Sequence, residues 1–283
     1  MQRKSDDMRV VRKPNESDPF LLLWKARGVP SVPHANSKKR SSCGEEFSAV
    51  SFAKERFPEL QRVSTHRAGE CGLLHRLDTD ACGLLLFATT QASYDALFAA
   101  QRDGKCLKTY EALCTPNDDN AALLGGFPPE KTVALENAAG HAIMLPCTAA
   151  LPETVSAGDA SPVVRRLPNA FIISSQFRAY GTGRRTVRPV TASSNTAARK
   201  KSGTQQYITR VQIVGATENG VLTRCSIANG FRHQVRCHLA WKGLPVRGDT
   251  LYNAQYDGTT LQFECVALSF PHPLTGELVR VAT

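Results

Sequence analysis

The sequence predicts an α+β fold with a largely antiparallel mixed sheet, and three observations support this prediction. Short runs that are apolar, or that alternate between apolar and polar residues, are typical of strands and outnumber the segments with helical periodicity. The two kinds of segment follow each other irregularly, whereas a parallel α/β fold alternates them regularly. The chain has 283 residues, which is enough to bury a sizeable core.

The N-terminal elements begin with a strand. Residues 20–25 form an apolar run that leads into a turn at Gly28-Val29-Pro30. Residues 42–56 predict a helix, because Ser42 and Glu45 form a capping box before a stripe of apolar residues. We therefore expect a strand, a turn and a helix in this order.

The next elements are a strand, a helix and a second strand. Residues 83–88 are entirely apolar and predict a buried strand. A helix follows, with Thr90 or Ser93 as its N-cap and Gly104 as its stop signal. Residues 108–114 alternate in the manner of a half-buried strand.

The C-terminal part of the chain predicts four strands and one helix. The strands lie at residues 207–214, 221–228, 263–270 and 278–281. Residues 232–242 have helical spacing and end at a glycine. The predominance of strands supports the α+β class.

Three segments carry weak structural signals. We expect residues 1–18 to form an N-terminal tail and residues 19–283 to form one domain. Residues 146–170 are rich in Ala, Ser, Pro and Gly, and residues 191–204 are rich in Ser and Thr, so both are expected to be surface insertions or loops.

The charge of the chain favours a polyanionic partner. The formal net charge is +10, and Lys and Arg side chains that neutralise phosphates release counterions. A basic surface that only aids solubility remains an equal alternative. The same alternatives hold for three basic stretches, at Lys38 to Arg40, Arg184 to Arg188 and Arg199 to Lys201.

The cysteine usage favours a reducing compartment, and the sequence shows neither a membrane span nor a secretory signal. We therefore expect a cytoplasmic protein. No run approaches the roughly 18 apolar residues that a membrane span needs, and the first residues lack the apolar segment of a secretory signal. The nine cysteines are an odd number without a CxxC pair, which argues against both a disulfide framework and a zinc site.

The stretch from Gly72 to Ala88, GLLHRLDTDACGLLLFA, is the first candidate for chemistry. It places His75, Arg76 and Asp78 between two apolar runs. Burial of a carboxylate costs several kcal/mol unless the group is paired or hydrogen-bonded. The trio is therefore either a structural ion pair or a functional group, and both readings stay open.

A second polar cluster lies between Asn229 and Tyr252. Arg232 and Arg236 are four residues apart in the predicted helix and are expected to share a face. The cluster predicts either a solvated basic side of a helix or a site for an anion or polar substrate. His233 and His238 are five apart, which is the wrong spacing for two metal ligands on one helical face.

Several stretches resemble motifs of one enzyme family, the RluA-type RNA pseudouridine synthases. HRLDTDACGLLLFA (His75 to Ala88) resembles the family's HRLD signature, and KTYEALC (Lys108 to Cys114) is similar to its second motif, which carries an active-site Tyr. GFRHQVRCHLAWKGLPVRGDTLY (Gly230 to Tyr252) resembles the third motif, although Phe-Arg stands where Arg-Thr is usual. Residues 20–34 and 265–278 resemble the family's opening strand and its usual end.

The resemblance implies a fold in which helices and loops flank a central cleft, and it implies roles for particular residues. Asp78 is expected to be the catalytic carboxylate, Tyr110 to stack on the target base, and Arg236 to pair with Asp78. Arg76 is similar to the family arginine that fills the space left by a flipped base. The other residues expected to bind substrate are His75, Arg232, His233 and Gln234.

The implied activity is the isomerisation of uridine to pseudouridine in structured RNA, either ribosomal or transfer RNA. The reaction needs no redox change, so we expect no cofactor and no metal. We expect a monomer with RNA as its partner and no membrane association. One alternative is a catalytically inactive RNA-binding protein on the same fold. A glycosidase would need a second carboxylate, for which Asp80 is the candidate.

Overall fold

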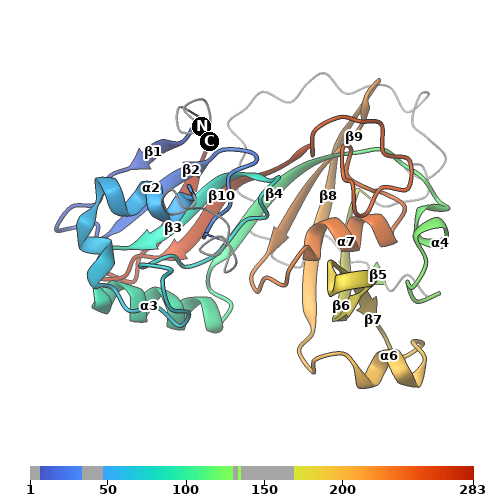
Figure 1. The fold of residues 1–283 in the computed structure, drawn as a ribbon, viewed down its shortest axis with the longest axis horizontal. Helices are drawn as coiled ribbons and strands as arrows, with labels where there is room; N and C mark the ends of the chain where they lie inside the picture. The colour runs from blue at the N-terminus through green and yellow to red at the C-terminus, as the bar shows by residue number, and fades with distance from the viewer. Residues whose placement is uncertain (1–6, 34–46, 130–132, 135–168) are drawn as a thin grey trace, which may run out of the picture. The chain divides into compact units, whose positions relative to one another are not determined.

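The computed structural model describes residues 7–33, 47–129, 133–134 and 169–283 (Figure 1). The chain divides into two compact units, and each is described separately. The first unit comprises Met1–Lys108 and Glu264–Thr283, and the second comprises Thr109–Phe263. Within the described residues, no helix is long and apolar enough to cross a membrane.

Five strands build the sheet of the first unit. They are β1 (Arg9–Arg12), β2 (Phe20–Lys25), β3 (Cys82–Ala88), β10 (Phe263–Pro271) and β11 (Leu278–Ala282). The pairs β1–β2, β2–β3 and β10–β11 are antiparallel, whereas β3 and β10 are parallel. The sheet is therefore mixed and largely antiparallel, as the sequence predicted.

The core of the first unit lies at its central strands and the helices beside them. All seven residues of β3 are buried, which fits the uninterrupted apolar run. The helices α2 (Ala49–Arg56) and α3 (Gln91–Arg102) pack against β2 and β3, respectively. Thr90 is the N-cap of α3 and forms a capping box with Ser93, so the prediction for this helix is confirmed.

Two sequence predictions for this unit are wrong in part. Within the expected tail of residues 1–18, Arg9–Arg12 form β1 and pair with β2. Short edge strands often carry charged residues instead of a long apolar run, and β1 was missed for this reason. The predicted helix at residues 42–56 begins at Ala49, after the N-cap Ser48; Ser42 and Glu45 lie outside the described residues.

The second unit has a strand order of β4, β9, β8, β6 and β5. These strands are β4 (Leu107–Cys114), β9 (Gly220–Ile227), β8 (Tyr207–Thr217), β6 (Ala170–Tyr180) and β5 (Val133–Ala134). The pairs β8–β9, β6–β8 and β5–β6 are antiparallel.

The strand β6 is shared between two partners. Its first half, from Ala170 to Ser175, pairs with β8, and its second half, from Gln176 to Tyr180, pairs with β7 (Thr186–Val190). The β6–β7 hairpin therefore extends from a strand that is already part of the larger sheet.

The core of the second unit consists of a helix and a cluster of aromatic side chains. The cluster contains Phe177, Tyr207, Phe231 and Tyr252. The helix α7 (Gln234–Trp241) contacts β7, β8 and the short helix α4 (Asn120–Leu124). His238 of α7 is fully buried and its ring nitrogens lie 2.9 Å from Ser175 Oγ and 2.8 Å from Thr209 Oγ1. Burial lowers the pKa of His238 from 6.5 to about 3, so the imidazole is neutral.

The structure also corrects two predictions for the second unit. The expected loop at residues 191–204 contains the helix α6 (Thr196–Lys200). Asn195 caps this helix through a hydrogen bond from Ala198 N. Of the expected insertion at residues 146–170, residues 146–168 lie outside the described residues, and Ala170 begins β6.

Candidate functional site

Asp78 lies in a turn that leads into β3. The segment before the turn runs beside β3, because Leu74 N donates to Leu86 O at 2.9 Å and Ala88 N donates to Gly72 O at 2.8 Å. Gly72 has a φ of +78°, and a side chain there would overlap the carbonyl of Ala88. The backbone hydrogen bond from Ala81 N to Asp78 O, at 3.1 Å, closes the turn.

The backbone on both sides of Asp78 is held by residues after β2. The Ser31 hydroxyl donates to Leu77 O at 2.8 Å and accepts from Leu77 N at 2.9 Å. Gly28 N donates to Thr79 O at 2.8 Å. The residues that precede and follow Asp78 are thus both fastened, which restricts the positions that its carboxylate can adopt.

Lys25, at the end of β2, adds a third fastening. Its ammonium group is fully buried and donates to three carbonyl oxygens, Ala26 at 3.0 Å, Val29 at 2.6 Å and Thr79 at 3.1 Å. An ammonium group has three N–H donors, so these three bonds use all of them. Burial lowers the pKa of Lys25 from 10.5 to about 8.

The role of Lys25 was not predicted from the sequence, although the sequence carries a signal for it. A charged residue closes an otherwise apolar strand, FLLLWK, where it is buried with the strand. A buried charge needs hydrogen-bonding partners, and the turn that follows β2 supplies carbonyl oxygens. The fold, rather than the local sequence, brings Thr79 to the same ammonium group.

His75 and Arg76 precede the turn and differ in environment. Both ring nitrogens of His75 are buried without a hydrogen-bond partner among the described residues. Burial, together with nearby Lys108, lowers the pKa of His75 to about 3, so this imidazole is neutral rather than a cation for phosphate. Arg76 is partly exposed, and its Nε lies 3.7 Å from Glu70 Oε1.

Tyr110 is placed by β4 of the second unit. Its side chain is buried, and its ring stacks on Phe263 with centroids 4.9 Å apart and planes 4° apart. Stacking on a second aromatic ring fixes the ring orientation. The predicted role of Tyr110 in contacting a base remains a prediction.

The segment that precedes α7 does not have the predicted helical form. His233 has a φ of +57°, so the helix begins only at Gln234. Arg232 therefore lies outside α7, and the prediction that Arg232 and Arg236 share a helical face is wrong. Arg232 Nη2 instead donates to Arg184 O at 2.6 Å and to Thr186 O at 3.3 Å.

Arg236 forms a buried two-bond ion pair with Asp249. The Nε–Oδ2 distance is 2.7 Å and the Nη2–Oδ1 distance is 2.8 Å, and the two side chains are 4% and 0% exposed. Asp249 Oδ1 also accepts from the backbone N–H groups of Leu251 and Tyr252, at 2.9 and 3.0 Å. Asp249 lies within the third motif, but its pairing with Arg236 was not predicted from the sequence.

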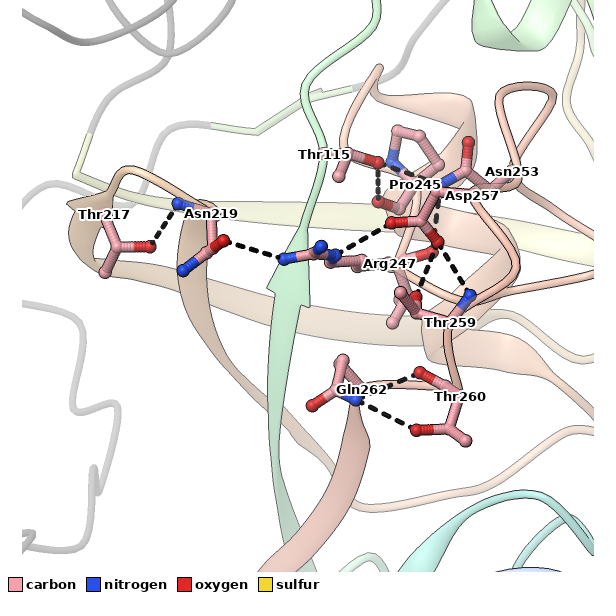
Figure 2. Close-up of polar contacts among 11 residues, drawn as sticks. Thr115, Thr217, Asn219, Pro245, Arg247, Asn253, Asp257, Thr259, Thr260 and Gln262 are labelled. Atoms are coloured by element: carbon pink, nitrogen blue, oxygen red, sulfur yellow. Dashed lines mark hydrogen bonds and ion pairs between the residues drawn. The ribbon is translucent and has the colours of Figure 1, made fainter.

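The loop that carries Asp249 is fastened by a second polar network, which Figure 2 shows. Arg247 Nε donates to Asp257 Oδ2 at 3.0 Å, and Arg247 Nη1 donates to Asn219 Oδ1 at 3.1 Å. Asn253 Nδ2 donates to Thr115 Oγ1 at 2.8 Å. The loop therefore holds Asp249 in place against Arg236 of α7.

His233 is oriented by a hydrogen-bond chain. Val187 N donates to the Tyr252 hydroxyl at 2.9 Å, and that hydroxyl lies 3.0 Å from His233 Nδ1. Burial raises the pKa of Tyr252, so its hydroxyl stays protonated. The contact between this hydroxyl and Nδ1 fixes the orientation of the His233 ring.

Gln234 is committed to internal contacts. Its Nε2 donates to Ile208 O at 3.0 Å, and its Oε1 accepts from Phe231 N at 3.0 Å. Of the residues predicted to bind substrate, His75 and Arg76 lie together in the first unit with Asp78. Arg232, His233 and Gln234 lie together in the second unit with Arg236.

Comparison with known proteins identifies the class to which this fold and these motifs belong. The family model for RNA pseudouridylate synthase matches residues 19–241. The chain belongs to this family, and the resemblance to RluA-type members is confirmed.

Individual relatives agree with the family match. The chain is 27% identical to RNA pseudouridine synthase 1 of Oryza sativa subsp. japonica over 217 residues, which are 72% of this chain and 57% of the relative. It is 34% identical over 83 residues to ribosomal large subunit pseudouridine synthase C of Salmonella typhimurium, or 26% of each protein. The chain thus spans little more than half the length of the rice relative and about a quarter of the Salmonella one.

A solved structure supports the fold. The human protein RNA Pseudouridylate Synthase Domain Containing 1 superposes with a TM-score of 0.58 at 16% identity, covering 99% of this chain and 84% of that one. The α+β class with a mixed, largely antiparallel sheet is therefore confirmed.

Proposed function

We propose that this chain isomerises uridine to pseudouridine in structured RNA, with Asp78 as the catalytic carboxylate. Membership of the pseudouridylate synthase family supports the reaction. The observation that carries the assignment of Asp78 is the turn in which it lies. The residues on both sides of Asp78 are held through their backbone by Ser31, Gly28 and Lys25. Preorganisation of this kind is what a catalytic carboxylate requires.

The proposed chemistry needs one carboxylate and no cofactor. Isomerisation breaks the N1–C1′ bond of uridine, turns the uracil, and forms a C5–C1′ bond; C5 loses a proton and N1 gains one. Asp78 acts as a nucleophile or as a base in this sequence. Tyr110 stacks on the base and assists proton transfer at C5. Arg236, itself held by Asp249, supplies positive charge for Asp78.

The proposed substrate is ribosomal or transfer RNA, and the name of the Salmonella relative favours ribosomal RNA. The target uridine leaves its stack to reach Asp78, at a cost of a few kcal/mol. Arg76, which is partly exposed, fills the vacated space. His75, Arg232, His233 and Gln234 shape the surroundings of the substrate, and Arg232 does so by holding the backbone of Arg184 and Thr186.

The test is pseudouridine formation by the purified chain. Ribosomal and transfer RNA transcripts are incubated with the wild type and with Asp78→Asn, and pseudouridine is mapped at single-nucleotide level. We expect a product with the wild type and a rate at least about 1,000-fold lower with Asp78→Asn, because essential catalytic groups cost this much.

The same experiment separates the alternative, an inactive RNA-binding protein on this fold. That protein would bind the transcripts with both variants and would form no product with either. Asp78→Asn that retains the wild-type rate would instead assign the chemistry to another residue.

A further inference from the structure

The positive charge of this chain is concentrated in one segment. The whole chain has 35 Lys and Arg residues against 25 Asp and Glu residues. Residues 160–217 contain ten of the basic residues and none of the acidic ones, so the rest of the chain is electrically balanced. Eight of the ten lie in the described residues 169–217, which we call the basic arm: Arg178, Arg184, Arg185, Arg188, Arg199, Lys200, Lys201 and Arg210.

Five cations of the basic arm are exposed at two places. Arg184 and Arg185 lie at the turn of the β6–β7 hairpin, and Arg199, Lys200 and Lys201 lie in and directly after α6. Figure 1 shows α6 standing away from the strands of its unit, on the connection between β7 and β8. None of the five forms an ion pair with another described residue, so their donors are available to an external anion.

The hairpin turn is held in an unusual backbone conformation. Arg184 has a φ of +55°, which a residue other than glycine seldom adopts. The guanidinium of Arg232 binds the carbonyl oxygens of Arg184 and Thr186 and thereby secures the turn. Arg232 is thus a positioning residue for the two exposed arginines, whereas the sequence predicted that it binds substrate directly.

The α6 end of the arm is also anchored. Ser202 Oγ donates to Gln176 Oε1 at 3.0 Å, and Gln176 Nε2 donates to Thr204 O at 3.3 Å. Gln176 belongs to β6, the strand that the arm shares with the larger sheet. Both groups of cations are therefore displayed from the same strand rather than from a free chain.

We propose that the basic arm is a docking surface for the phosphate backbone of the RNA substrate. The inference rests on the proposed function, because it names the surface through which that RNA is held. Guanidinium groups that have no carboxylate partner offer planar two-pronged contacts to phosphate. A surface with many cations and no anions repels itself, and a polyanion relieves that repulsion.

The composition of the arm disfavours other partners. Protein interfaces and membrane surfaces need apolar anchors. Among the described residues of the arm, Ile208 is the one large hydrophobic side chain that is exposed. An arm with five exposed cations and one such apolar residue suits a nucleic acid better than an acidic protein or a lipid surface.

The test measures how salt weakens the binding of a fluorescently labelled hairpin RNA by the whole chain. The arm variants are Arg184→Gln/Arg185→Gln and Lys200→Gln/Lys201→Gln. The matched control is Arg62→Gln/Arg102→Gln, which removes two exposed charges from the first unit. Each lost phosphate contact lowers the slope of log K against log salt by about 0.7 to 0.9, so each arm variant is expected to lower it by about 1 to 2. The control is expected to keep the wild-type slope.

Asp78→Asn separates this inference from the proposed function. It is expected to bind RNA with the wild-type slope although it forms no pseudouridine. If the arm variants lower the salt slope of RNA binding but the wild type forms no pseudouridine, the result would support the basic arm as the RNA-docking surface and reject the proposed reaction. Melting temperatures of all variants show whether each is folded, and the two arm variants test different elements.

Three results would overturn the inference. The first is an unchanged slope in both arm variants, and the second is an equal decrease in the arm variants and the control. The third is arm-dependent binding to vesicles of phosphatidylcholine with phosphatidylserine while RNA binding does not depend on the arm.

Discussion

The turn around Asp78 and the segment from Phe231 to Arg236 use their polar groups in opposite ways. In the turn, side chains from residues 25–31 bind the backbone beside Asp78. In the segment, Arg232 and Gln234 bind the backbone of other elements with their own side chains. Both stretches are clusters of polar residues in the sequence. The backbone of the turn accepts hydrogen bonds from neighbouring residues, whereas the side chains of the segment donate hydrogen bonds to neighbouring backbone.

The difference separates residues that act from residues that support. A side chain in a turn held through its backbone can be replaced while the turn keeps its form. A side chain that binds the backbone of neighbouring elements cannot be removed without disturbing them. We therefore expect substitutions of the buried residues of the segment, Gln234 and Arg236, to reduce stability first, and substitutions that release the turn to reduce activity first.

The largest effect on stability is expected at Arg236. Arg236→Ala leaves the fully buried Asp249 carboxylate without its counter-charge, which should lower the free energy of unfolding by about 3 to 5 kcal/mol. Arg236→Lys should recover part of the loss, because an ammonium group cannot form the planar two-bond contact. Urea denaturation measures both.

The matched variant on the partner side is Asp249→Asn, which removes the carboxylate that accepts two hydrogen bonds from the buried Arg236 guanidinium. It should be destabilised by a similar amount. A loss below about 1 kcal/mol in both Arg236→Ala and Asp249→Asn would show that the segment does not support the fold through this pair.

A smaller loss of stability with a large loss of rate is expected at Lys25. Lys25→Met removes the donor for three carbonyl oxygens and should cost about 1 to 3 kcal/mol. Release of Thr79 should also displace Asp78, and a shift of about 1 Å can cost up to about 100-fold in rate. Single-turnover assays should therefore show a fall of about 10- to 100-fold with unchanged RNA affinity. The exposed Lys105→Met serves as the control, and equal rates in the two variants would contradict the prediction.

Acid should destabilise the protein through His238. Burial of the His238 imidazole lowers its pKa to about 3 in the folded protein, whereas in the unfolded chain the pKa of His238 has the ordinary value of 6.5. The contribution to stability is complete above pH 6.5 and is lost as pH falls towards 3, by up to about 1.4 kcal/mol per pH unit. His238→Gln should have a shallower dependence of unfolding free energy on pH in this range. His75 of the first unit should shift stability in the same direction. A His238→Gln slope equal to that of the wild type would reject the prediction.

The smallest effect on stability is expected at Arg232. Its side chain is exposed, so Arg232→Ala should change the unfolding free energy by less than about 1 kcal/mol. Loss of its bonds to the hairpin turn should loosen Arg184 and Arg185 and weaken RNA binding. Anisotropy with the labelled hairpin RNA measures this change. Wild-type affinity in Arg232→Ala would show that the turn keeps its conformation without Arg232.

Strong local patterns made part of the fold predictable. The strand β3 is an uninterrupted apolar run and α3 has a capping residue, so both were predictable within one or two residues. The strands β1 and β6 were not predictable, because an edge strand needs no apolar run and β6 mixes serines with apolar residues. Pairing with distant strands decides these two elements.

By itself the sequence determined the family, the position of Asp78 in its motif and the strands with strong periodicity. Only the tertiary structure decided that Lys25 reaches Thr79, 54 residues away, and that Arg236 binds Asp249. It also decided that α7 begins only after His233, so that Arg232 lies outside the helix that carries Arg236. Local patterns record which surfaces must be buried, since burial of apolar area depends on residue type and spacing. The partner of a buried polar group depends instead on which distant segments the fold brings within hydrogen-bond distance.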